Sequence, residues 1–82
     1  MAIEVVVDGL DLVRSRALTQ AVRQTIRDVR ARGVLRVAVL PSGARNSWGV
    51  GVRRRSGWAV TWFDATADDV IGRVTDTLRR TA

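Results

Sequence analysis

Hydrophobic and polar positions predict four strands along the chain. Residues 2–8, AIEVVVD, are rich in β-branched side chains that partly alternate, which is typical of a strand. Residues 34–40, VLRVAVL, predict a second strand that stops at Pro41, because proline cannot donate a hydrogen bond to a sheet. Residues 48–63 hold two further apolar runs on either side of a short polar turn, and they predict a β-hairpin.

Two other segments predict helices. Residues 16–31 and 67–80 carry apolar side chains at steps of three and four, the spacing of an amphipathic helix. Ser15 is expected to cap the first helix and Thr66 the second, because a hydroxyl there accepts a hydrogen bond from an early helical amide. Gly33 is expected to close the first helix in a left-handed conformation. Two acid–base pairs in the second helix stand four residues apart and are expected to form ion pairs: Asp69 with Arg73, and Asp76 with Arg80.

The register of the hairpin follows from its connection. A three-residue loop, Arg55-Ser56-Gly57, with a left-handed Gly57, sets Arg54 opposite Trp58. A two-residue Ser56-Gly57 loop would put the two apolar runs on opposite faces, and a slip of one residue is costly because it turns core residues outward. The three-residue loop predicts one core face: Trp48, Val50, Val52, Trp58, Val60 and Trp62. It also predicts one open face: Gly49, Gly51, Arg53, Ala59, Thr61 and Phe63.

The order of these elements predicts the fold class. We expect an α+β protein, a two-layer β-α-β-β-β-α sandwich with a four-stranded sheet and two helices on one face of it. The 82 residues are enough for a single small domain, 1–82. The second face of the sheet is then left open.

Composition narrows the function. The chain has 14 basic residues, all arginine, against 8 acidic ones, and a net charge of +6, which favours an anionic partner such as nucleic acid, acidic lipid or an acidic protein. It lacks histidine, cysteine, lysine and tyrosine, which excludes imidazole bases, thiolate and amine nucleophiles and the usual zinc ligands. We therefore expect that the protein is not an enzyme and that it has no cofactor and no metal site.

The DGLD segment at 8–11 predicts a turn and not a metal site, because a calcium site needs more oxygen ligands than this segment offers. The chain has no run of about 18 apolar residues, so we predict no membrane span, and the expected location is the cytoplasm.

Two arginine clusters are candidate nucleic-acid contacts. Guanidinium groups suit phosphates and keep their charge, but an arginine stripe is also typical of a solvated helix face. The first helix carries one cluster on its polar side: Arg16, Arg23, Arg27 and Arg30. The hairpin carries the other: Arg53, Arg54 and Arg55. The hairpin arginines either contact an anion or protect an exposed strand edge with charge.

The open face of the predicted sheet is a candidate partner interface. Val6, Ala38, Thr61 and Phe63 are expected to form an apolar patch there, and a homodimer through this face is the simplest form of such an interface. The three tryptophans are expected in the core, with stacking on single-stranded bases as the alternative.

Residues 10–18, LDLVRSRAL, resemble the N-terminal domain of the ribosome hibernation-promoting factor and protein Y family. Members show a strand, a glycine, a hydrophobic–acidic–hydrophobic triplet and then a Ser or Thr that opens the first helix; the matching residues here are Gly9, Leu10, Asp11, Leu12 and Ser15. Residues 64–80 occupy the place of the family's final helix. The resemblance implies the β-α-β-β-β-α fold and binding to the decoding region of the small ribosomal subunit through basic residues. Residues 48–80 also resemble the strand–strand–helix DNA-binding arms of phage integrases.

Two hypotheses follow. The first is a small basic protein that binds nucleic acid through arginine contacts to the phosphate backbone. RNA or the ribosome is favoured over DNA as its target. The second is a protein-interaction or oligomerising accessory module that uses the open sheet face and takes an acidic partner or a second copy of itself. Arginines of the helix and of the hairpin that converge on one surface would support the first hypothesis. Arginines that point apart would support the second.

Overall fold

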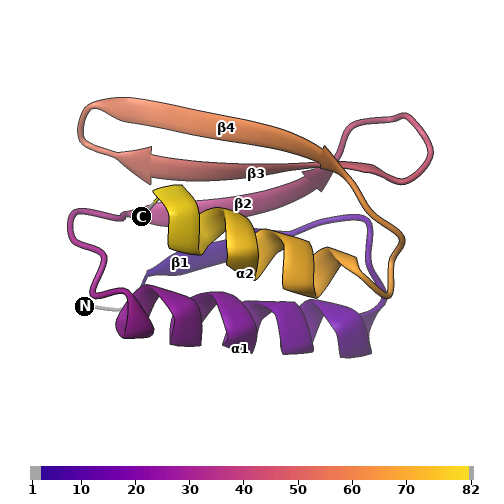
Figure 1. The fold of residues 1–82 in the computed structure, drawn as a ribbon, viewed down its shortest axis with the longest axis horizontal. Coiled ribbons are helices and arrows are strands. Elements are labelled where there is room, and N and C mark those ends of the chain that lie inside the picture. The colour runs from indigo at the N-terminus through magenta and orange to yellow at the C-terminus, as the bar shows by residue number, and fades with distance from the viewer. Residues whose placement is uncertain (1–2, 82) are drawn as a thin grey trace.

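A computed structural model describes residues 3–81 and contains the expected four strands and two helices in the order β-α-β-β-β-α (Figure 1). The predicted α+β fold class is confirmed. The element bounds are β1 Glu4–Val7, α1 Leu12–Asp28, β2 Arg36–Pro41, β3 Ser47–Arg54, β4 Gly57–Asp64 and α2 Val70–Thr81.

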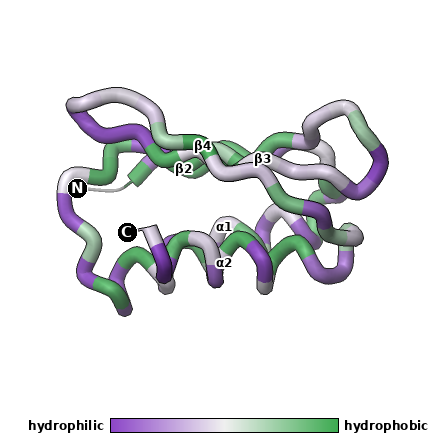
Figure 2. Tube along the Cα trace, turned by 45° about the horizontal axis from the view of Figure 1, so that its top comes forward, coloured by the Kyte–Doolittle hydropathy of each residue, from purple (hydrophilic) through white to green (hydrophobic). Residues whose placement is uncertain are grey.

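The strands lie in the sheet in chain order, β1-β2-β3-β4. β1 and β2 are parallel and are joined through α1, whereas β2, β3 and β4 are successive antiparallel neighbours. Figure 2 shows the sheet as one layer and both helices as the other. The sheet therefore keeps one face free of helices. No helix within residues 3–81 is both long and apolar enough to cross a membrane.

The core lies between the helices and the inner sides of β2 and β3. Alternation along these strands turns every second side chain toward the helices, and the helices meet them with side chains at steps of four. The side chains buried there include Leu18, Val22 and Ile26 of α1, Val37 and Val39 of β2, Trp48, Val50 and Val52 of β3, and Val70, Val74 and Leu78 of α2. Trp48, predicted in the core, is 7% exposed, and its indole N–H donates to the Ala65 carbonyl at 2.9 Å.

The first helix begins earlier than predicted. Asp11, not Ser15, is the N-cap, and its carboxylate accepts a hydrogen bond from the Arg14 amide at 2.8 Å. That hydrogen bond, with further help from the Arg14 guanidinium, lowers the pKa of Asp11. Arg14 also pairs with Asp68, which ties the start of α1 to the segment before α2. The helix ends before Arg30, which takes the left-handed conformation (φ 52°), so Gly33 lies beyond the end that it was expected to close.

The second helix begins later than predicted, at Val70. Thr66 still caps the preceding turn, because its hydroxyl accepts from the Asp69 amide at 3.3 Å and its carbonyl accepts from the Val70 amide at 3.0 Å. The expected Asp69–Arg73 and Asp76–Arg80 ion pairs are absent among residues 3–81, whose ion pairs are Arg14–Asp11, Arg14–Asp68 and Arg36–Glu4. The exposed side of α2 thus holds charges that its own helix does not neutralise.

The predicted hairpin register is wrong by one residue. Arg54 pairs with Gly57, so the loop is Arg55-Ser56, and Gly57, although at φ 121°, is the first residue of β4. Trp48, Val50 and Val52 face the helices as predicted, but the shift exchanges the two faces of β4. Trp58, Val60 and Trp62 lie on the open face, and Ala59, Thr61 and Phe63 lie on the helix face.

The reason for the register lies in the residues opposite β4. Gly49 and Gly51 leave room on the open side of β3, and the indoles of Trp62 and Trp58 fill that room. On the helix side, α2 packs beneath β3 and not centrally beneath β4, so the inner side of β4 needs little bulk. Phe63, half-buried at the end of β4, covers the remaining gap.

Candidate functional site

The candidate site is the open face of the sheet, which is almost wholly apolar. Each strand contributes to it the residues that alternate with its core positions. Val6 and Ala38, both predicted on this face, are indeed there, since they are paired with each other and lie between core positions. The other members come from β2, β3 and β4: Leu40, Gly49, Gly51, Trp58, Val60 and Trp62.

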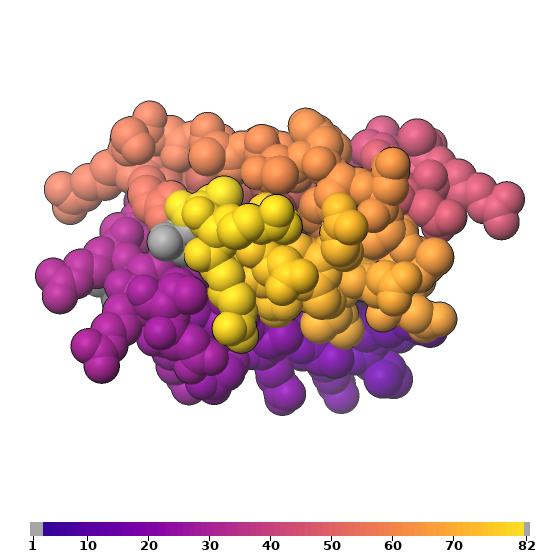
Figure 3. Space-filling view, in the orientation of Figure 1, coloured from indigo at the N-terminus to yellow at the C-terminus, as the bar shows by residue number. Residues whose placement is uncertain are grey.

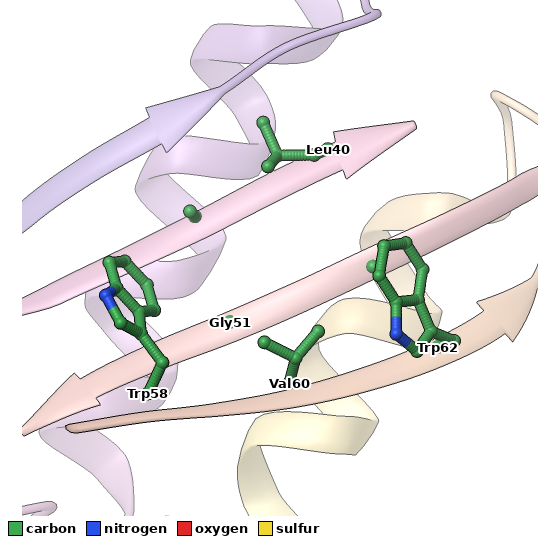
Figure 4. Close-up of a pocket in the computed structure, with 7 residues that line it drawn as sticks. Leu40, Gly51, Trp58, Val60 and Trp62 are labelled. Atoms are coloured by element: carbon green, nitrogen blue, oxygen red, sulfur yellow. The ribbon is translucent and has the colours of Figure 1, made fainter. Parts of the chain in front are cut away.

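Two tryptophans lie across β3 with their rings on its glycines (Figure 4). A Cβ added to Gly49 would stand 2.6 Å from the Cζ3 atom of Trp62, and one added to Gly51 would stand 3.1 Å from the Cε3 atom of Trp58. Carbon atoms in ordinary contact are about 3.5–4.0 Å apart. The two indoles therefore fit against the backbone so closely that no larger residue fits at either position without moving them.

Between the two indoles the face is hollowed. A shallow pocket of about 230 Å³ is lined by Ala38, Leu40, the two glycines, Trp58, Val60 and Trp62. The exposed fraction of the residue is 48% for Trp58, 52% for Val60 and 59% for Trp62. Large apolar side chains that gather on one face and stay this exposed make the open face a candidate binding surface.

The ends of the open face are polar. At one end Arg36 pairs with Glu4 at 2.8 Å, and Arg53 lies beside Arg36 and directly opposite Trp58 on the next strand. At the other end, alternation places Asp64 on the same side as Trp62. An apolar centre with a basic end is thus the chemical character of this surface.

The arginine clusters predicted to contact nucleic acid lie on both sides of the sheet. Arg16, Arg23 and Arg27 are on α1, in the layer opposite the open face, and Arg30 follows that helix. Arg53 is on the open face, Arg54 alternates to the helix side and Arg55 is in the turn. None of the seven forms an ion pair within residues 3–81. In Figure 3 the hairpin tip and the segment after α1 project as separate protrusions. The two clusters do not merge into one basic surface.

Three residues predicted on the open face, Ala59, Thr61 and Phe63, are on the other side. Thr61 and Phe63 face the helix layer, where the Arg73 guanidinium lies 5.7 Å from the centroid of the Phe63 ring. Asp8 and Asp11 form turn and cap contacts, since Asp8 accepts from the Gly9 amide at 2.9 Å and Asp11 caps α1. The described residues hold no cluster of three carboxylates that could bind a metal ion.

Sequence reasoning missed Trp58, Val60, Trp62 and Leu40 as surface residues. The signal that could have found them is the GVG segment, with its two glycines at alternate positions and two tryptophans on the neighbouring strand. Comparisons with protein-family models and with curated proteins find no match for this chain.

Proposed function

We propose that this protein is an interaction module that binds a protein partner with the open face of its sheet. The observation that carries the proposal is the exposure of Trp58, Val60 and Trp62 on indoles that are fitted onto glycines. Aromatic anchors in the apolar centre of a surface contribute most of the binding energy in protein interfaces. Because the rings are already held against the backbone, little conformational entropy is lost when a partner covers them.

The charge of the module suggests the chemistry of its partner. Arg53 borders the apolar centre, Arg54 and Arg55 follow it at the hairpin tip, and the chain carries a net charge of +6. Complementary charge at the rim speeds encounter and fixes orientation. The preferred partner segment therefore has apolar side chains for the pocket and carboxylates at the end that meets the hairpin.

A second candidate function is binding of single-stranded nucleic acid, with RNA or the ribosome as the target. One observation favours it: Trp58 lies with its ring on the sheet and is directly opposite Arg53, so a base stacked on the indole would have its phosphate near a guanidinium. Sheet faces with exposed aromatic residues and basic borders stack bases in this way. The arginines of α1, on the other layer, would contribute nothing to such a site.

A selection from a random displayed peptide library separates the two candidates. The wild-type protein is expected to enrich peptides that combine apolar and acidic residues, and binding should shift the tryptophan fluorescence to shorter wavelength as Trp58 and Trp62 lose water. The double variant Trp58→Ser, Trp62→Ser should lose this binding, while the matched surface variant Arg23→Gln, Arg27→Gln on α1 should keep it.

The same proteins are then titrated with a mixed-sequence RNA oligonucleotide at low salt. Peptide binding that is unaffected by the loss of both tryptophans contradicts the proposed site. Binding of RNA, abolished by the tryptophan variant and without any enriched peptide, replaces the proposal with the second candidate.

A further inference from the structure

The outer edge of β4 is a second feature of this fold that has no partner. β4 is the last strand of the sheet, and nothing in the described chain pairs with its outer side. Seven of its eight residues are exposed. Its only charged residue is Asp64, and it contains neither proline nor lysine, the usual means by which an edge strand avoids pairing with another chain.

The hydrogen bonds around β3 show which backbone groups of β4 point outward. The Arg53 carbonyl accepts from the Leu35 amide at 2.8 Å and so points away from β4, and the Ala65 amide donates to the Asn46 carbonyl at 2.8 Å and so points toward β3. Because successive residues of an antiparallel strand direct these groups to alternate sides, the outward-pointing set is fixed. It consists of Trp58, Val60, Trp62 and Asp64.

We infer that β4 pairs antiparallel with β4 of a second copy of this chain, which joins two four-stranded sheets into one of eight strands. The four outward-pointing residues are centred on Thr61. Only the register that places Thr61 opposite Thr61 of the second copy pairs all four on both strands. Val60 then stands opposite Trp62 of the second copy, and Trp58 opposite its Asp64. A closed twofold arrangement of this kind is the commonest symmetry among soluble oligomers.

Helix α2 supplies the argument for a second copy over an unrelated strand. Its exposed side alternates in charge, with Arg73, Asp76 and Arg80 at steps of three and four, and none of the three forms an ion pair among residues 3–81. This stripe is self-complementary when two copies run antiparallel. With the axis at Thr61, Asp76 of each copy meets Arg80 of the other. Like charges directly opposite would oppose pairing, and this order avoids them.

The charged stripe and the edge of β4 lie on the same side of the molecule. A groove of about 250 Å³ between β4 and α2 is lined by Thr61, Trp62 and Phe63 from the strand and by Arg73, Thr77, Arg80 and Thr81 from the helix. In Figure 3 the surface of α2 lies below that of β4 on the side facing the viewer. Pairing at β4 therefore brings the two stripes toward each other.

The distances agree with this arrangement. Neighbouring strands are about 4.8 Å apart, so helices that pack beneath β3 in each copy lie about 14 Å apart, a gap that an arginine and a carboxylate can bridge from opposite helices. Along the strand, Arg73 lies at the level of Phe63, and β4 and α2 run in opposite directions (Figure 1). Thr61 is two residues, about 7 Å, from Phe63 along the strand, and the midpoint between Asp76 and Arg80 is five residues, about 7.5 Å, from Arg73 along the helix, so this midpoint lies at the level of Thr61. One twofold axis serves both contacts.

Cysteine cross-linking tests the register directly, because the chain has no cysteine of its own. Thr61→Cys should form a disulfide-linked dimer under mild oxidation, since directly opposite residues of this type have Cα atoms about 4.5 Å apart, within the reach of a disulfide. Ala59→Cys is the matched control on the same strand and the same face. Its Cα atoms would be about 14 Å apart in this register, so it should not cross-link.

The charged stripe is tested by sedimentation equilibrium of the uncrosslinked protein. Wild type should show twice the mass of the 9.0 kDa chain. Asp76→Arg should weaken the dimer about tenfold or more, and Arg80→Asp combined with Asp76→Arg should restore it, because the exchange preserves complementarity.

Several outcomes overturn the inference: a wild type that stays monomeric at high concentration, equal cross-linking of the two cysteine variants, or a double exchange that fails to restore the dimer. The Asp76→Arg variant, whose substitution lies outside the open face, should lose the dimer while it keeps the peptides that bind that face. The dimer and the proposed function thus fail independently.

Discussion

Replacing Gly49 by alanine tests the fit between β3 and the tryptophans of β4. The new Cβ would stand 2.6, 2.8 and 3.0 Å from three ring atoms of Trp62, so the indole has to move outward by about 1 Å or leave the sheet. Trp62 is 59% exposed, which means that about two-fifths of the side chain is covered and stands to lose its contact.

The cost can be worked from that area. A tryptophan buries up to about 250 Å², so two-fifths is about 100 Å², worth at most about 2.5 kcal/mol at about 25 cal/mol per Å². Alanine also stabilises the fold by about 0.4–1 kcal/mol, because the unfolded chain has fewer conformations with alanine than with glycine. The net loss expected for Gly49→Ala is about 1–2 kcal/mol, a fall in Tm of roughly 4–15 °C for a domain of this size.

A double-mutant cycle with thermal and urea denaturation measures the effect. In the Trp62→Ala background the clashing ring is gone, so Gly49→Ala should become neutral or stabilising, with a coupling energy of about 1–2 kcal/mol. Gly51→Ala, whose nearest ring atom is at 3.1 Å, serves as the milder comparison and should cost less. Equal losses for Gly49→Ala with and without Trp62 would refute the reasoning, because the strain would then arise elsewhere.

Three further predictions concern other parts of the molecule. Trp48→Ala should cost about 3–5 kcal/mol, because it empties the core and leaves the Ala65 carbonyl without its donor, and denaturation should show a loss well above that of Trp58→Ala. The pKa of Asp11 is lowered on folding from 3.8, so its carboxylate stabilises the fold above that pH and the gain disappears as pH falls through the lower folded value. The Tm difference between wild type and Asp11→Asn should therefore shrink in acid, and a constant difference would argue against the charge as its source. If the protein binds RNA, replacing Arg53, Arg54 and Arg55 by Gln should flatten the log–log salt dependence of affinity by about one to two units while Tm stays nearly constant; an unchanged slope would remove the hairpin from that site.

Local patterns determined the elements and their order. The β-branched runs gave β1 and β2, the three-and-four spacing gave the buried stripes of α1 and α2, and the inner side of β3 was correct to the residue. These features follow from the chain itself, because periodicity of two or of 3.6 already decides which side chains share a face. The start of α1 could not be predicted from the local sequence, because Asp11 and Ser15 are both able to cap a helix. Only the contacts with Arg14 favour Asp11.

The tertiary structure alone decided which face of β4 is open. The hairpin sequence allows both registers, and the bulk of Trp58 and Trp62 argues for the core when the strand is considered by itself. Helix α2 packs beneath β3, so the inner side of β4 needs only Ala59, Thr61 and Phe63, while the glycines of β3 offer the rings a closely fitting place outside. The position of a helix that is distant in sequence thus fixed the register, and with it the exposed aromatic surface on which the proposed function depends.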